Sequence, residues 1–251
     1  MPLLWNRGTI SLGIRRADFR RADPVHRRVM LITTAILDFD GTLASSLEGI
    51  HACFQEALAT HGYPELSLAA VRRTVGLTLE ESVRILTNGQ CDGAQLNEVV
   101  AFYRTLYAEK GRAMATLFPG AMETLSALKN MGIQIAVVSN KSYAGVRRLA
   151  EQLSIDAHID LMLGADNVSF RKPDARLYTE TIAPHLPDSC GHHVLMVGDT
   201  ESDLRFARNA GLRSCWASYG YGDQAACKAL EPEFILPDIG RLPRLIQSIT
   251  D

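Results

Sequence analysis

Short apolar runs alternate with amphipathic stretches along most of this chain of 251 residues. The runs are predicted to be strands over 35–40, 133–138, 193–198 and 213–217. Because they are apolar throughout, they are typical of strands that are buried on both faces of a parallel sheet. The stretches between them, 121–131, 144–153, 175–185 and 202–210, are predicted to be helices. This alternation predicts an α/β fold with a doubly wound, Rossmann-like parallel sheet.

One connection is too long for a single crossover helix. Between residues 46 and 118 no convincing strand is found, and helices are predicted over 47–61, 68–75, 79–87 and 94–111, with Ser67 and Thr78 as N-caps. We therefore expect a catalytic core of residues 31–45 and 114–251 and an inserted all-helical cap of residues 46–113. Because the insert follows the carboxyl end of the first strand, where ligands bind in open α/β sheets, we expect it to act as a lid.

The N-terminal segment, residues 1–30, differs from the rest of the chain in charge. Seven arginines and two aspartates give residues 1–29 a charge of +5, although the whole chain carries a formal −2. The remainder is therefore acidic, which argues against a nucleic-acid-binding protein. The segment itself is interpreted as a disordered basic tail, a targeting presequence, or sequence that precedes a native start at Met30, and the last reading is favoured.

Membrane insertion and disulfide bonding are also disfavoured. No apolar run approaches the roughly 18–20 residues that a membrane-spanning helix needs. The five cysteines are scattered, without a C-x-x-C pair, so we expect neither a disulfide framework nor a cysteine–zinc site. This pattern is typical of a reducing compartment, and a cytoplasmic location is expected.

The strongest chemical signal is the run Asp38-Phe39-Asp40-Gly41-Thr42 at the end of the first predicted strand. Two carboxylates so close together can approach one site, where each raises the pKa of the other. A hard divalent cation bound through oxygen atoms would remove this conflict. Taken alone, the two aspartates could also cap the end of the strand.

Three later segments place polar side chains at equivalent positions. Ser139 and Asn140 follow the second predicted strand, and Asp199 and Asp203 follow the third. Lys172 precedes a predicted helix and could supply a positive charge. Because the carboxyl ends of parallel strands lie at one edge of a sheet, we expect these groups to converge.

The four segments DFDGT, VSN, RKPD and GDTESD resemble, in order, the motifs of the haloacid dehalogenase-like (HAD) hydrolase superfamily. The helical insert resembles the α-helical cap of its phosphoglycolate phosphatase-like branch. The resemblance implies that Asp38 is the nucleophile, which forms an aspartyl-phosphate, and that Asp40 is the general acid and base. It implies a Mg²⁺ site made by Asp38, the Asp40 backbone carbonyl, Asp199 and Asp203. It also implies that Thr42, Ser139, Asn140 and Lys172 bind the phosphoryl group.

The expected function is therefore Mg²⁺-dependent hydrolysis of a small phosphorylated metabolite, with 2-phosphoglycolate as the best guess. A carboxylate at position 40, which dehalogenase relatives lack, favours phosphate-ester hydrolysis. A sugar phosphomutase and a pyrophosphatase remain alternatives. Mutases of this type usually carry a cap histidine at the position of Ile50, whereas here His51 is one residue further on. The presence of every chemical residue disfavours a non-catalytic binding protein, and either a monomer or a homodimer is compatible with the sequence.

Substrate selection is expected to depend on the cap loop of residues 72–78. We expect Arg73, or its neighbour Arg72, to pair with a substrate carboxylate, and Gly76 to lie in the same loop beside the substrate. Ser45 stands where the branch usually has an acidic residue, at the junction of core and cap. This departure concerns substrate preference or lid closure rather than the basic chemistry.

Overall fold

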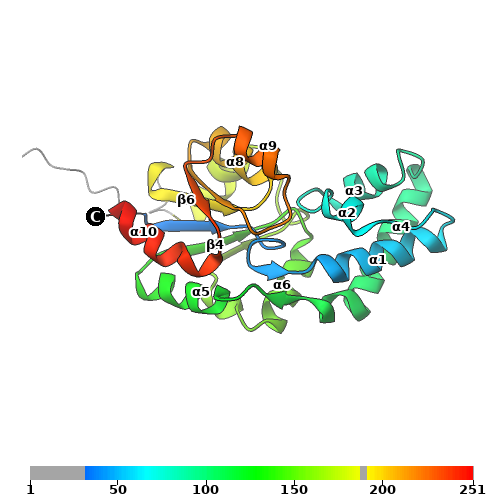
Figure 1. The fold of residues 1–251 in the computed structure, drawn as a ribbon, viewed down its shortest axis with the longest axis horizontal. Helices are drawn as coiled ribbons and strands as arrows, with labels where there is room; N and C mark the ends of the chain where they lie inside the picture. The colour runs from blue at the N-terminus through cyan, green and yellow to red at the C-terminus, as the bar shows by residue number, and fades with distance from the viewer. Residues whose placement is uncertain (1–31, 187–190, 251) are drawn as a thin grey trace, which may run out of the picture.

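A parallel sheet forms the centre of the larger part of the molecule (Figure 1). The computed structural model describes residues 32–186 and 191–250, and the predicted segment 1–30 lies outside this range. Within the described residues, one sheet has the strand order β5-β4-β1-β6-β7-β8, and all its neighbouring strands are parallel. The strands are β1 (Thr34–Leu37), β4 (Gln134–Val138), β5 (Leu161–Leu163), β6 (Val194–Gly198), β7 (Arg213–Ala217) and β8 (Phe234–Leu236). The predicted α/β fold is confirmed.

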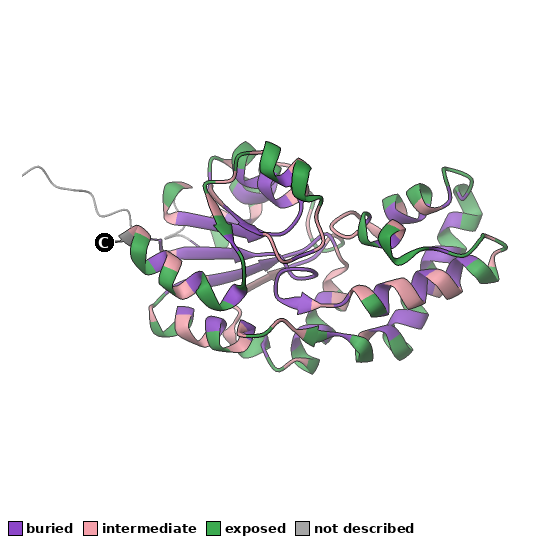
Figure 2. Ribbon diagram, in the orientation of Figure 1, coloured by how far each residue is buried: buried purple, intermediate pink, exposed green. Residues whose placement is uncertain are grey.

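Helices cover both faces of the sheet, and β1 shows how the faces are divided. Ala35 and Leu37 pack into the hydrophobic cluster under α5 (Ala121–Asn130), α6 (Tyr143–Gln152) and α10 (Leu242–Thr250). Ile36 points the other way, into the cluster beside α8 (Glu201–Ala210). This alternation is the two-residue period of a strand. The central strands β1, β4 and β6 are accordingly almost entirely buried (Figure 2).

The insert lies beyond the carboxyl edge of the sheet (Figure 1). It contains α1 (Leu47–Thr60), α2 (Leu68–Arg72), α3 (Leu79–Leu86) and α4 (Gly93–Leu106), followed by a π-helical turn (Tyr107–Gly111) and a 3₁₀ turn (Arg112–Met114). Its apolar side chains form a hydrophobic cluster of their own. Ser67 and Thr78 accept backbone N–H groups at the starts of α2 and α3, so both predicted N-caps are confirmed.

The insert and the core meet at a short antiparallel ladder. Here β2 (Ala44–Ser45) pairs with β3 (Thr116–Leu117), so both crossings of the chain lie side by side. The expectation that 46–118 holds no strand was therefore wrong at Thr116–Leu117. That strand is too short to leave a periodic pattern, and its partner lies across the whole insert.

A further difference from the predicted elements concerns helix geometry. The helix predicted over 175–185 is a π-helical turn (Leu177–Ile182) followed by the short α7 (Ala183–His185). The smaller elements are α9 (Gln224–Ala229) and the 3₁₀ turns Asp156–His158, Gly191–His193 and Ile239–Arg241.

In the part of the chain that the structure describes, no helix combines the length and apolarity needed to cross a membrane. Cys53, Cys91, Cys215 and Cys227 are buried free thiols.

Candidate active site

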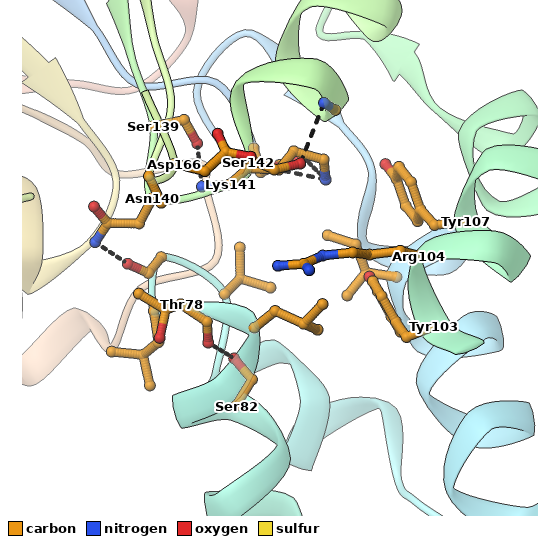
Figure 3. A pocket seen from close by; sticks show the side chains of 18 of the residues that line it. Thr78, Ser82, Tyr103, Arg104, Tyr107, Ser139, Asn140, Lys141, Ser142 and Asp166 are labelled. Atoms are coloured by element: carbon orange, nitrogen blue, oxygen red, sulfur yellow. Dashed lines mark hydrogen bonds and ion pairs between the residues drawn. The ribbon is translucent and has the colours of Figure 1, made fainter. Parts of the chain in front are cut away.

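A cavity of about 410 Å³ lies between the carboxyl edge of the sheet and the insert. The core contributes Asp38 and Asp40, which follow β1, and Ser139 and Asn140, which follow β4. The insert contributes polar and aromatic side chains of α3, α4 and the π-helical turn, which Figure 3 shows facing the core residues. The cavity thus lies where a parallel sheet is expected to bind its ligand.

Three carboxylates converge beside this cavity. Asp38, Asp199 and Asp203 each offer an oxygen atom within 4.8 Å of the others, and all three are buried. Asp203 is fixed by helix capping, because its Oδ2 accepts hydrogen bonds from the backbone N (3.0 Å) and Oγ1 (2.8 Å) of Thr200 at the start of α8. Asp199 Oδ2 accepts the backbone N–H of Tyr221 at 2.7 Å. The group is therefore rigidly held.

Lys172 lies between two of these carboxylates. Its Nζ donates to Asp38 Oδ1 at 2.7 Å and to Asp203 Oδ1 at 2.6 Å. Burial works to lower the pKa of Lys172, but Asp203 and Asp38 together outweigh it, so the pKa is raised and the ammonium form is retained. Lys172 thus places one buried positive charge among three carboxylates.

The remaining negative charge is destabilised by burial. Burial raises the pKa of Asp38 to about 7, although Lys172 opposes this shift. Burial, followed by repulsion from Asp38 and Asp203, raises the pKa of Asp199 well above its ordinary value. A cation would stabilise the ionised forms of both groups. The donor set fits Mg²⁺, because it consists of hard carboxylate oxygens.

Asp40 lies in a different environment from Asp38. Ser46 Oγ donates to Asp40 Oδ1 at 2.5 Å, and Lys141 Nζ lies 3.3 and 3.2 Å from the two Asp40 oxygens. The ammonium of Lys141 also lies 4.1 Å from the centre of the Tyr107 ring of the insert. Lys141 was missed by the sequence analysis, although it directly follows the predicted pair Ser139-Asn140.

The groups predicted to bind a phosphoryl oxygen fall into two sets. Ser139 and Asn140 line the cavity, and Asn140 Nδ2 donates to the carbonyls of Gly76 (2.8 Å) and Lys172 (3.1 Å). Thr42 is fully buried, and its hydroxyl donates to Asp199 Oδ1 at 3.1 Å. The structure therefore gives Thr42 a role in orienting Asp199 and does not support direct phosphate binding by its side chain.

The predicted substrate arginines do not reach the cavity. Arg73 is exposed and does not line it, although Gly76 does. Arg72 instead donates to the carbonyls of Gly220 (2.9 Å) and Tyr221 (3.0 Å) in the core. The structure thus does not support substrate pairing by either residue, because Arg72 is held by the core loop and Arg73 does not line the cavity.

Four other arginines line the cavity instead. They are Arg104, Arg112, Arg148 and Arg171. Figure 3 shows Arg104 pointing from α4 into the cavity between Tyr103 and Tyr107. The sequence held no signal that would have singled them out, because the orientation of the insert relative to the core was not known.

The loop that follows β7 contacts both the insert and the group of three carboxylates. Tyr221 accepts the backbone N–H groups of Ser46 (2.8 Å) and Leu47 (3.2 Å) on its hydroxyl, while its own N–H binds Asp199. A Cβ added to Gly220 would lie 2.2 Å from Asp199 Cβ. The loop therefore approaches Asp199 so closely that only glycine fits at this position.

Comparison with known proteins agrees with this geometry. Residues 35–217 match the family model described as haloacid dehalogenase-like hydrolase. The chain is 31% identical to Probable phosphatase IndB of Dickeya dadantii, over 80% of this chain and 87% of that protein. It is also 31% identical to phosphoglycolate phosphatase of Vibrio cholerae, over 83% and 94% of the two chains. A predicted phosphoglycolate phosphatase from Haemophilus somnus shares its fold, with a TM-score of 0.80 at 23% identity over 86% and 98%.

Proposed function

Because the chain belongs to the haloacid dehalogenase-like hydrolase family and is a phosphatase, we propose that it hydrolyses a small phosphorylated metabolite with Mg²⁺ as cofactor. The leading candidate substrate is 2-phosphoglycolate, which the name of the Vibrio cholerae relative suggests. The observation that carries this proposal is the pair Asp38 and Asp40 at the cavity, each with a different lysine partner.

The two carboxylates would take two different roles in the reaction. Asp38 would attack phosphorus, forming an aspartyl-phosphate as the bond to the leaving oxygen breaks. Asp40 would act as the general acid and transfer a proton to that oxygen. In the second step Asp40 would take a proton from water, whose oxygen attacks phosphorus and releases inorganic phosphate and free Asp38.

The other core residues would hold and neutralise the phosphoryl group. Ser139 and Asn140 line the cavity. Ser139 would donate its hydroxyl to the phosphoryl oxygens and Asn140 its backbone N–H, because the Asn140 amide already donates to the carbonyls of Gly76 and Lys172, and Lys172 would keep Asp38 in position. Asp38, Asp199 and the Asp40 backbone carbonyl would bind Mg²⁺, with Asp203 supporting them. When bound, this ion would neutralise charge on the phosphoryl oxygens.

Two features of the insert support hydrolysis by a lidded site. Ile50 lines the cavity at the position where mutases usually carry a histidine, while His51 Nε2 donates to the Leu66 carbonyl at 2.9 Å within the insert. This arrangement favours a hydrolase over a sugar phosphomutase. Residues 46–113 would act as the lid, excluding water when closed.

Release of phosphate from 4-nitrophenyl phosphate, with and without Mg²⁺, tests the proposal. We expect Mg²⁺-dependent turnover by the wild type and a loss of at least about a thousandfold in Asp38→Asn. Burst formation of an acid-stable phosphoenzyme, absent from Asp38→Asn, would identify the nucleophile. A wild type that is inactive with Mg²⁺, or an Asp38→Asn variant of undiminished activity, would refute the proposal.

A further inference from the structure

Several cationic side chains on the cavity wall have no carboxylate partner. Two of the lining cations are paired, Lys141 with Asp40 and Arg104 with Glu80. In the described residues no carboxylate lies within 4.0 Å of Arg112, Arg148 or Arg171, which also line the cavity. The positive charges of these three arginines are therefore not compensated by carboxylates of the described residues.

Arg112 belongs to the insert and Arg148 to the core, and both line the cavity. Arg112 begins the 3₁₀ turn at the end of the insert, and its carbonyl accepts Gln152 Nε2 of α6 at 3.1 Å. Arg148 lies four residues before Gln152, one turn along the same face of α6 and nearer to Lys141 in sequence. One anion between them could thus contact the insert and the core together.

Arg112 also carries an unsatisfied polar atom. Its Nε is buried and has no hydrogen-bond partner among the described residues. A buried donor that belongs to a charged group is costly to leave unpaired, and native proteins satisfy nearly all such atoms. A carboxylate or phosphate oxygen in the cavity would supply the missing acceptor.

We infer that the substrate carries a second anionic group, a carboxylate or another phosphate, that is recognised by Arg112 and Arg148. This inference rests on the proposed phosphatase function and names its specificity-determining residues. The volume of about 410 Å³ falls within the range of pockets for sizeable ligands, so there is room for such a group beyond the phosphoryl site. 2-Phosphoglycolate meets the charge requirement, as do longer phosphorylated acids and bisphosphates.

Matched pairs of substrates isolate the second charge. 3-Phosphoglycerate and glycerol 3-phosphate differ in one carboxylate, as do 2-phosphoglycolate and 2-hydroxyethyl phosphate. Fructose 1,6-bisphosphate and fructose 6-phosphate differ in one phosphate, so this pair distinguishes the two anionic sources. For each pair, kcat/KM is measured for the wild type, Arg148→Gln, Arg112→Gln and Arg147→Gln. Arg147 is the matched control, because it is adjacent to Arg148 and exposed like it, but pairs with Glu151 at 2.8 Å and does not line the cavity.

We expect the wild type to prefer the anionic member of at least one pair. Arg148→Gln and Arg112→Gln should reduce this preference about five- to tenfold, mainly through KM, while Arg147→Gln leaves it unchanged. Should Arg112→Gln fail to fold, as judged by its thermal unfolding, Arg148→Gln carries the test.

The two hypotheses fail in different ways. A wild type that hydrolyses 4-nitrophenyl phosphate but shows no preference for an anionic member overturns the inference alone. The same conclusion follows if the preference survives Arg148→Gln or falls equally in Arg147→Gln. A wild type that hydrolyses no phosphomonoester overturns the proposed function, and this inference with it.

Discussion

Lys172 Nζ lies 2.6 Å from Asp203 Oδ1, and both side chains are almost completely buried. The same ammonium contacts Asp38, so a single cation compensates two carboxylates in the described site. Removal of one partner from a buried ion pair is far more costly than removal of an exposed one, because the remaining charge cannot be solvated.

Replacement of Lys172 should therefore destabilise the fold as well as abolish activity. We expect Lys172→Met to lower the free energy of unfolding by about 3–5 kcal/mol in urea denaturation without Mg²⁺. Arg176→Met is the control, because Arg176 forms an exposed ion pair with Asp174 and its loss should have little effect. Equal stability losses in the two variants would show that the buried pair is not the cause.

The metal-free protein should lose stability as the pH rises. The folded-state pKa of Asp38 is about 7, above the ordinary 3.8, and that of Asp199 is also raised. The contribution of Asp38 to stability is present below about pH 4 and is lost as the pH rises to about 7, because ionisation is less favourable in the folded state, and the contribution of Asp199 changes in the same direction. Mg²⁺ should consequently raise Tm more at pH 7 than at pH 5. Differential scanning fluorimetry checks this, and Asp199→Asn should reduce the difference; a pH-independent Mg²⁺ effect would contradict it.

Gly220 should control the affinity for Mg²⁺ through Asp199. A Cβ at this position would lie 2.2 Å from Asp199 Cβ and 2.5 Å from the Gly41 carbonyl oxygen, so Gly220→Ala must displace the carboxylate. We expect about 10- to 100-fold weaker Mg²⁺ binding in isothermal titration calorimetry. In the control Gly240→Ala, the nearest atom to the new Cβ is 3.4 Å away, and binding should be unchanged. Wild-type affinity in Gly220→Ala would rule out this coupling.

Arg72 should fasten the insert to the loop that orients Asp199. Its guanidinium donates to the carbonyls of Gly220 and Tyr221, whereas the adjacent Arg73 does not line the cavity and makes no hydrogen bond to this loop among the described residues. Arg72→Gln should accelerate hydrogen exchange of the Tyr221 and Ser46 amides, about fivefold if the two bonds contribute about 1 kcal/mol. Arg73→Gln should leave both rates unchanged. Identical exchange in the two variants would exclude the proposed fastening role.

The central strands could be predicted from the sequence because each is a continuous apolar run. β1, β4, β6 and β7 lie within or close to their predicted limits. β5 and β8 have three residues each, which is too few for a recognisable pattern, and β8 begins at a partly exposed Phe234. The π-helical turns were read as regular helix, since side-chain periodicity does not distinguish one wider turn.

The candidate site also has a part that the sequence predicts and a part that it does not. The sequence predicts that Asp38, Asp199 and Asp203 converge, because the carboxyl ends of parallel strands share one edge of a sheet. The assignments of Arg72 and Arg73 were unsupported because they depended on how α2 is rotated against the core, which is set by packing. Tertiary packing also places Arg112 and Arg148 at the cavity, so the sequence alone could not predict their position. The same holds for the contacts of Lys141 with Asp40 and Tyr107.

The pairing of Ala44–Ser45 with Thr116–Leu117 has a topological consequence. Neighbouring strands lie about 5 Å apart, so the chain enters the insert and returns from it at two points that lie side by side. The enclosed helices pack around their own apolar cluster and share no strand with the sheet. A tight turn could therefore bridge the gap. Replacement of the insert would then change the cavity lining that it contributes, while Asp38, Asp199 and Asp203 would keep their places at the edge of the sheet.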